Sequence, residues 1–311
     1  MSKKAKEKKL KVIIDYDGTL TREEDQVEEL IERAINVLSK EILGIPRSRV
    51  RRDYWAAQKK ILANPENFAW TVNGVPACYP DEGAFTLNTT TIQEMVTSNG
   101  LYQERIKMAF GDGEYDPAAE CTNYLFHRNT PFLEPSFRKE AREALISLIK
   151  NPLIYPVVLT NSKADKVKKN LETLGIGEKG KDGDFSWRVE ILGDTRQYHM
   201  EAGWDHFFSH PQLGRIQILP VNGDLKVDLR RPVYYQALLD QVKDGSRLVA
   251  VGDIFSLVGS VPLMMGFPFI LFKTPYLPSW SQDYVKAHPL GRVIEDLALL
   301  PQEIEGILEN D

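Results

Sequence analysis

The 311-residue chain has 42% hydrophobic and 27% charged residues, a composition that allows a sizeable core and more than one domain. Its net charge of −5 argues against a general nucleic-acid binder, because affinity for a phosphate backbone rests on Lys and Arg. No apolar stretch reaches the roughly 20 residues that span a bilayer, and the basic residues 1–9 lack the apolar core of a signal peptide. With two cysteines and no export signal, we expect a cytoplasmic protein without nucleic-acid or membrane partners.

The first predicted element is a strand over residues 10–15. Val12, Ile13 and Ile14 form a continuous apolar run, which is typical of a strand buried in a parallel sheet. Asp15 then lies at the carboxyl edge, where open α/β sheets bind ligands. Asp17 is two residues further on, so its side chain lies on the same side and can serve as a general acid and base beside a nucleophilic Asp15. The alternative interpretation is an ordinary Asp–Gly turn after a strand.

Residues 21–130 are far too long for a normal strand-to-helix connection. Helical periodicity predicts helices over residues 27–38, 48–62 and 91–110, and therefore a mainly helical inserted domain over residues 21–130. An arginine cluster at the start of the second helix would suit a second anionic group on a ligand, or is merely exposed: Arg47, Arg49, Arg51 and Arg52. Several aromatic side chains line a pocket or form the core of this domain: Trp55, Phe68, Trp70, Tyr79, Tyr102 and Phe110.

The remaining chain alternates strands and helices. A helix is expected from an N-cap at Ser136 to residue 149, a strand over 154–160, a helix over 163–174, and a helix that starts at Pro232. Further strands are predicted over residues 187–192, 247–252 and 268–272. This order predicts an α/β fold with a doubly wound, Rossmann-like parallel sheet, formed by residues 1–20 and 131–311. The loop-rich residues 194–225 are expected to form a rim, a homodimer contact or a second substrate-binding element.

Four short motifs in order resemble the signatures of the haloacid dehalogenase-like (HAD) superfamily of phosphohydrolases. Asp15-Tyr-Asp17-Gly-Thr-Leu resembles the first signature, and the strand that ends in Thr160 and Asn161 resembles the second. Arg231, just before Pro232, stands where the third signature places a Lys or Arg, and Gly252-Asp253 resembles the fourth. Gly193-Asp194 is a weaker match to the fourth signature because its strand is less apolar.

The resemblance implies a role for each matched residue. Asp15 is the nucleophile, Asp17 the general acid and base, and the phosphate is held by Thr160, Asn161 and Arg231. A Mg²⁺ ion is bound by Asp15, by Asp253 and by the backbone carbonyl of Asp17, which fits the need of this charged site for a hard cation with oxygen ligands. The implied protein is a Mg²⁺-dependent phosphatase that acts on a small phosphorylated metabolite, with the inserted helical domain as a cap.

Two alternatives stay open at this stage. A phosphomutase or phosphotransferase uses the same residues, and a non-catalytic member binds a phosphorylated ligand or a partner without turnover. The second alternative is motivated by a departure from the family pattern, since Ser256, Leu257 and Val258 occur where many members have another acid. That acid usually acts on the metal through water, and Ser256 is a candidate to hold the water in its place.

Overall fold

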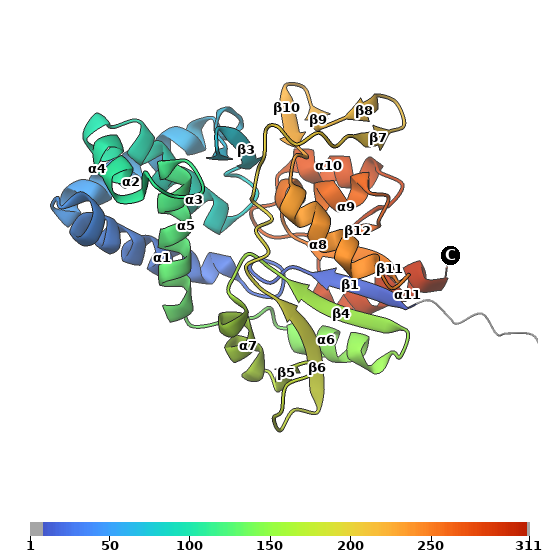
Figure 1. The fold of residues 1–311 in the computed structure, drawn as a ribbon. Coiled ribbons are helices and arrows are strands. Elements are labelled where there is room, and N and C mark those ends of the chain that lie inside the picture. The colour runs from blue at the N-terminus through green and yellow to red at the C-terminus, as the bar shows by residue number, and fades with distance from the viewer. Residues whose placement is uncertain (1–8, 310–311) are drawn as a thin grey trace, which may run out of the picture.

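The computed structural model describes residues 9–309, so most of the basic segment at residues 1–9 lies outside the described residues. Its centre is a seven-stranded sheet in the order β13-β12-β11-β1-β4-β6-β5, and every paired neighbour is parallel (Figure 1). The strands are β1 (Leu10–Ile14), β4 (Ile154–Leu159), β5 (Ile176–Glu178), β6 (Trp187–Leu192), β11 (Arg247–Gly252), β12 (Phe269–Phe272) and β13 (Gly291–Ile294). All five predicted strands are therefore present.

Strand β1 occupies the middle of this sheet. Its neighbours are β11 on one side and β4 on the other, with Ile14 opposite Val251 and Val158. The chain continues from β1 to β4 on one side and later returns to β11 on the other. The carboxyl end of β1 therefore lies at a topological switch point, where open α/β sheets bind ligands.

Helices cover both faces of the sheet, as predicted for a doubly wound fold. Val12 and Ile14 belong to the apolar cluster that contains α6 (Ala141–Lys150), α7 (Ala164–Glu172) and α11 (Leu300–Glu309). Ile13 belongs to the opposite cluster, with α8 (Pro232–Val242), α9 (Ser260–Met264) and α10 (Ser279–Ala287). This division follows from the alternation of side chains along a strand.

The segment between β1 and β4, residues 21–130, is called the insertion below. It comprises the helices α1 (Glu23–Val37), α2 (Arg47–Ala63), α3 (Ala84–Thr97), α4 (Gly100–Phe110) and α5 (Pro117–Asn129), with a π-helical turn at Leu38–Leu43 and a hairpin of β2 (Trp70–Val72) and β3 (Val75–Cys78). Its helices gather to one side of the sheet (Figure 1) and share an apolar cluster that includes Ile35, Tyr54 and Tyr102. The domain limits at residues 20/21 and 130/131 stay a prediction.

Two helix predictions need correction. The helix predicted over residues 91–110 is two helices, because the Asn99 side chain accepts from the backbone N–H groups of Leu101 and Tyr102 and so starts α4 as an N-cap. The helix predicted from Ser136 begins only at Ala141. Before it the chain is held against the first motif, where Phe137 bridges Thr21 and the Arg138 backbone N–H donates to the Leu20 carbonyl.

Residues 194–225 leave the sheet and contribute to two hairpins. These are β7 (Phe208–His210) with β8 (Gly214–Ile216), and β9 (Ile218–Asn222) with β10 (Leu225–Asp228). A homodimer contact on this segment stays a prediction. No helix within residues 9–309 is long and apolar enough to cross a membrane.

Candidate active site

Three of the expected site residues follow the carboxyl ends of adjacent strands. Asp15 follows β1, Thr160 follows β4 and Asp253 follows β11, and the parallel register brings these ends to one edge of the sheet. The Asp15 backbone N–H donates to the Val251 carbonyl at 2.9 Å, which fixes the first motif against the fourth. All three side chains are buried.

The turn after Asp17 is shaped around Asp253. Gly18 has a φ of 81°, and a Cβ added there would lie 2.1 Å from the Asp253 Oδ2 atom, so both the backbone conformation and the space require glycine. The Thr19 hydroxyl donates to Asp253 Oδ1 at 3.0 Å. The Asp-Gly-Thr sequence therefore positions the fourth-motif carboxylate.

Asp17 is held by two side chains from the segment after β4. Ser162 Oγ donates to Asp17 Oδ2 at 2.5 Å, and Lys166 Nζ donates to Asp17 Oδ1 at 3.0 Å. Lys166 also donates to Ser162 Oγ at 2.9 Å, and its side chain is only 7% exposed. None of the sequence motifs identifies Lys166, which lies in the helix predicted over residues 163–174.

Arg231 does not reach this cluster, so its predicted role needs correction. Its guanidinium is fully buried and donates to the backbone carbonyls of Gln197, at 2.7 Å, and of Ala77. It does not line the pocket that contains Asp15. Two of its nitrogens donate to backbone oxygens, and its buried Nε has no hydrogen-bond partner among the described residues. The structure therefore leaves Lys166 as the cation beside Asp17.

Burial and mutual repulsion dominate the electrostatics of the acids. Burial, and next the charges of Asp253 and Asp17, raise the pKa of Asp15. Burial raises the pKa of Asp253 to about 7, although the hydrogen bond from Thr19 opposes the shift. Glu23, which sequence reasoning missed, is also buried at the site and accepts from the backbone N–H of Ala84. Burial and the charges of Asp253 and Asp17 raise its pKa.

The donor set fits a hard divalent cation. Asp253 Oδ2 is buried and has no hydrogen-bond partner among the described residues, and it shares the site with a second buried carboxylate, Asp15. A cation bound by these two carboxylates and by the Asp17 backbone carbonyl would relieve their repulsion. Residues 9–309 contain no group of three or more His, Cys, Asp or Glu side chains arranged to hold a metal. Water and a substrate phosphate would have to complete such a coordination shell.

A carboxylate from the insertion contacts Ser256, one of the positions where this chain lacks the acid that the family pattern leads one to expect. Glu82 is fully buried, accepts from the Ser256 backbone N–H at 2.8 Å and also accepts from the Ser256 hydroxyl. The Ser256 hydroxyl is thus committed to Glu82, and the expectation that it holds a water for the metal needs correction. No motif in the sequence indicates Glu82, because 174 residues separate it from Ser256.

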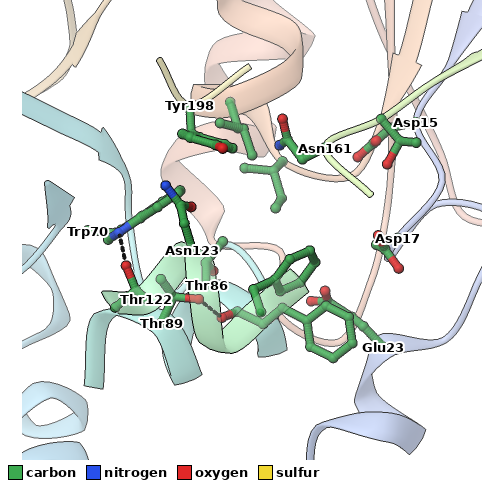
Figure 2. Close-up of a pocket in the computed structure, with 15 residues that line it drawn as sticks. Asp15, Asp17, Glu23, Trp70, Thr86, Thr89, Thr122, Asn123, Asn161 and Tyr198 are labelled. Carbon is green, nitrogen blue, oxygen red and sulfur yellow. Dashed lines mark hydrogen bonds between the residues drawn. The ribbon is translucent and has the colours of Figure 1, made fainter. Parts of the chain in front are cut away.

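The sheet edge and the insertion form a pocket together, and Asp15 and Asp17 line it (Figure 2). Asp15, Asp17, Thr160 and Asn161 come from the sheet edge, and the Asn161 Oδ1 atom accepts from the Gln197 backbone N–H at 2.8 Å. The other lining residues are Glu23, Trp70, Phe85, Thr86, Thr89, Thr122, Asn123, Phe126, Tyr198, Ile254 and Leu257. The structure therefore brings five of the six predicted site residues to one cluster, with Arg231 as the exception.

Comparison with known proteins finds similarity in solved structures alone. No family model matches the chain, and no curated protein matches it. A 2-haloacid dehalogenase from Pseudomonas syringae pv. Tomato is 14% identical, covers 96% of this chain and 99% of its own, and has a TM-score of 0.43. A putative HAD-hydrolase from Bacillus subtilis bound to magnesium is 12% identical, with 97% and 99% covered and a TM-score of 0.43. A HAD phosphatase from Thermococcus onnurineus is 13% identical, with 95% and 97% covered and a TM-score of 0.44.

These three neighbours are all HAD-like hydrolases, and they include a dehalogenase as well as a phosphatase. Structural similarity at these sequence identities and TM-scores assigns no reaction to this chain. The reaction of this chain depends on its own site residues and not on its fold.

Proposed function

We propose that this chain is a HAD-like hydrolase that removes phosphate from a small phosphomonoester with the help of Mg²⁺. The observation that carries the proposal is the placement of Asp17, which lines the same pocket as Asp15 and is oriented by Ser162 and Lys166. An alkoxide leaving group needs a proton and a halide does not, so a carboxyl group held at this place favours phosphoester cleavage over dehalogenation.

The residues divide the reaction into two displacements. The Asp15 carboxylate attacks phosphorus and the ester P–O bond breaks, while Asp17 gives its proton to the leaving oxygen. Asp17 then takes a proton from water, which attacks the aspartyl phosphate, releases inorganic phosphate and restores Asp15. A Mg²⁺ ion held by Asp15, Asp253 and the Asp17 backbone carbonyl would supply positive charge that offsets the charges of the nucleophile and the phosphate.

Three further side chains suit the phosphate. The Thr160 Oγ1 atom accepts from the Ser162 backbone N–H at 3.1 Å, which orients the hydroxyl at the strand end. Asn161 lines the pocket beside it, and its amide nitrogen is a second donor. Lys166 adds a positive charge on the side of Asp17.

The test is hydrolysis of a panel of phosphomonoesters by purified protein with Mg²⁺, with the Asp15→Asn variant as the inactive control. We expect phosphate release that chelation of Mg²⁺ abolishes. In the Asp17→Asn variant, turnover should fall by roughly 10²–10⁴ because the general acid and base is lost. Unchanged turnover in this variant would reject the role of Asp17.

Product analysis separates the remaining alternatives. Isomerised ester in place of inorganic phosphate indicates a mutase. No turnover above the Asp15→Asn control, with a phosphate analogue bound, indicates a binding protein.

A further inference from the structure

Aromatic side chains line much of the pocket. Trp70 and Tyr198 have ring centroids 5.3 Å apart with planes inclined at 49°, and Phe85 and Phe126 have centroids 5.8 Å apart in an edge-to-face arrangement. Figure 2 shows Trp70 and Tyr198 together on the wall across from Asp17. Such rings offer flat apolar surfaces for an organic group attached to the phosphate.

The wall is held rigidly before any ligand binds. The Trp70 indole N–H donates to the Thr122 hydroxyl at 3.2 Å, and Thr122 in turn donates to the Ala119 carbonyl at 2.9 Å. Tyr198 also packs edge-to-face on Tyr115, with centroids 5.9 Å apart. These contacts fix the ring orientations, which reduces the entropy lost on binding.

The pocket offers no partner for a second anionic group. Its lining residues that carry a full charge when ionised at neutral pH are, within the described part of the chain, the acids Asp15, Asp17 and Glu23. Lys166 stands beside Asp17 and is already paired with it. The arginines at the start of α2 do not line the pocket, and Arg47 and Arg51 pair with Glu32. A second carboxylate or phosphate on the substrate would therefore lose its hydration without gaining a positively charged partner. It would face acids and aromatic rings, which disfavours binding.

One polar group on the wall is uncommitted. The Asn123 Nδ2 atom is buried without a hydrogen-bond partner among the described residues. In contrast, the Thr86 and Thr89 hydroxyls donate to the carbonyls of Gly83, at 2.9 Å, and of Phe85, at 2.8 Å. A ligand that offers a hydrogen-bond acceptor to Asn123 would satisfy this buried donor.

We infer that the substrate is the phosphate monoester of an uncharged, flat organic group whose edge carries a hydrogen-bond acceptor. This inference rests on the proposed function for the place of the phosphate, at Asp15. The ring packs between the Trp70–Tyr198 pair and the Phe85–Phe126 pair, and its acceptor receives the Asn123 amide N–H.

Binding to the Asp15→Asn variant tests the inference without relying on turnover. Calorimetric titration with Mg²⁺ present compares 4-acetylphenyl, phenyl, cyclohexyl and 4-carboxyphenyl phosphate. We expect the 4-acetylphenyl ester to bind about tenfold more tightly than the 4-carboxyphenyl ester, because a buried unpaired charge is costly. The phenyl ester should bind more tightly than the cyclohexyl ester.

Substitutions on α5, in the same background, test the contact with Asn123. Asn123→Leu should reduce the ratio of 4-acetylphenyl to phenyl ester affinity by about five- to tenfold, the effect of one hydrogen bond to a buried donor. Tyr124→Leu, on the exposed side of the same helix, is the matched control and should keep the ratio. Asn123→Ser, which is smaller and polar, gives the same comparison if the leucine variant does not fold.

The two proposals fail in different ways. Equal or tighter binding of the 4-carboxyphenyl ester, or an affinity ratio that the Asn123 variants leave unchanged, overturns the inference about the substrate. Preferential binding of the neutral aryl ester without any hydrolysis by the native protein supports that inference and rejects the phosphatase reaction.

Discussion

Lys166 replaces Arg231 as the basic residue of the site. The two residues differ in what surrounds their nitrogens: Lys166 meets the carboxylate of Asp17 and the hydroxyl of Ser162, whereas Arg231 meets two backbone carbonyls. Ser162 directly precedes Lys163, the N-cap of α7, and Lys166 lies in the first turn of this helix, so a spacing of four residues brings both to the helix start. That spacing is the signal in the sequence that could have identified Lys166.

The Lys166→Met variant tests this assignment. Methionine keeps an unbranched side chain but removes the charge, so we expect kcat/KM for a phosphomonoester to fall by roughly 10²–10³, the usual effect of losing one preorganised electrostatic contact. Lys169→Met, at an exposed position of the same helix, should retain the native value. Steady-state kinetics with a melting-temperature check decides the matter, and equal activity of the two variants would contradict the assignment.

The other site residues differ in how far sequence alone could identify them. Asp15, Thr160 and Asp253 each follow an apolar strand, and parallel strands bring such ends together. The strand pattern therefore predicts their proximity, whereas Thr160 and Asp253 were identified as site residues through the resemblance of their motifs to the HAD signatures. Glu23 and Glu82 lie in the insertion, and they reach the site only through its packing on the sheet edge. No periodicity or spacing encodes that packing.

At the scale of elements, Glu82 joins the loop before α3 to the turn after β11. It accepts from both the backbone and the side chain of Ser256, and from the Tyr79 backbone N–H at 3.2 Å. The turn that it holds directly follows Asp253. Glu82 therefore acts as a positioning residue for the fourth motif.

Glu82 also makes stability depend on pH. Burial raises its pKa from an ordinary value of 4.5 to about 7, although the hydrogen bonds from Ser256 oppose the shift. Because the folded protein holds this proton more tightly than the unfolded chain, the contribution is complete below about pH 4.5 and is lost as pH rises towards 7. The change amounts to roughly 3 kcal/mol in the free energy of unfolding.

The Glu82→Gln variant isolates this contribution. Glutamine stays neutral, so the free energy of unfolding should decline less between pH 5 and pH 7.5 than it does in the native protein. Urea denaturation at several pH values measures the difference in the free energy of unfolding between the two proteins. Asp15, Glu23 and Asp253 also have raised pKa values, but they are present in both proteins, so their contributions cancel in this difference. An identical decline in both proteins would show that Glu82 does not titrate in this range.

The elements of the sheet were more predictable than those of the insertion. Most of the predicted strands are largely apolar runs, although β6 contains Arg188 and Glu190. The short strands β5 and β13 and the β7–β8 hairpin have few buried residues each and give a weak pattern. Helix α5 was missed although Asp116 caps it and Pro117 starts it. The split between α3 and α4 depends on the single cap at Asn99, which apolar periodicity does not register.

At the scale of the whole molecule, the hairpin of the insertion is part of the same apolar core as one face of the sheet. Val72 and Val75 belong to the cluster that contains Tyr234 and Val261. A polar contact also joins the insertion to the rest of the molecule: the indole N–H of Trp280, on α10, donates to the Asp81 side chain of the insertion at 3.1 Å. Part of the apolar surface of the insertion is therefore buried only by the sheet and its helices, and part of theirs only by the insertion.

We expect this shared core to make the chain unfold in one cooperative transition despite its length. Val72 on β2 and Val261 on α9 are both fully buried, so Val72→Ala and Val261→Ala should each destabilise the protein by about 2 kcal/mol through lost burial and the cavity left behind. Because the two sites lie in one cooperative unit, each variant should lower the midpoint of the whole calorimetric transition, with the calorimetric and van't Hoff enthalpies equal. If the insertion unfolded separately, Val72→Ala would instead shift only one of two resolved transitions and Val261→Ala only the other. The arrangement of the pocket makes this cooperativity relevant to function, since Glu23 and Asn123 reach the acids of the sheet edge only while the insertion is folded against it.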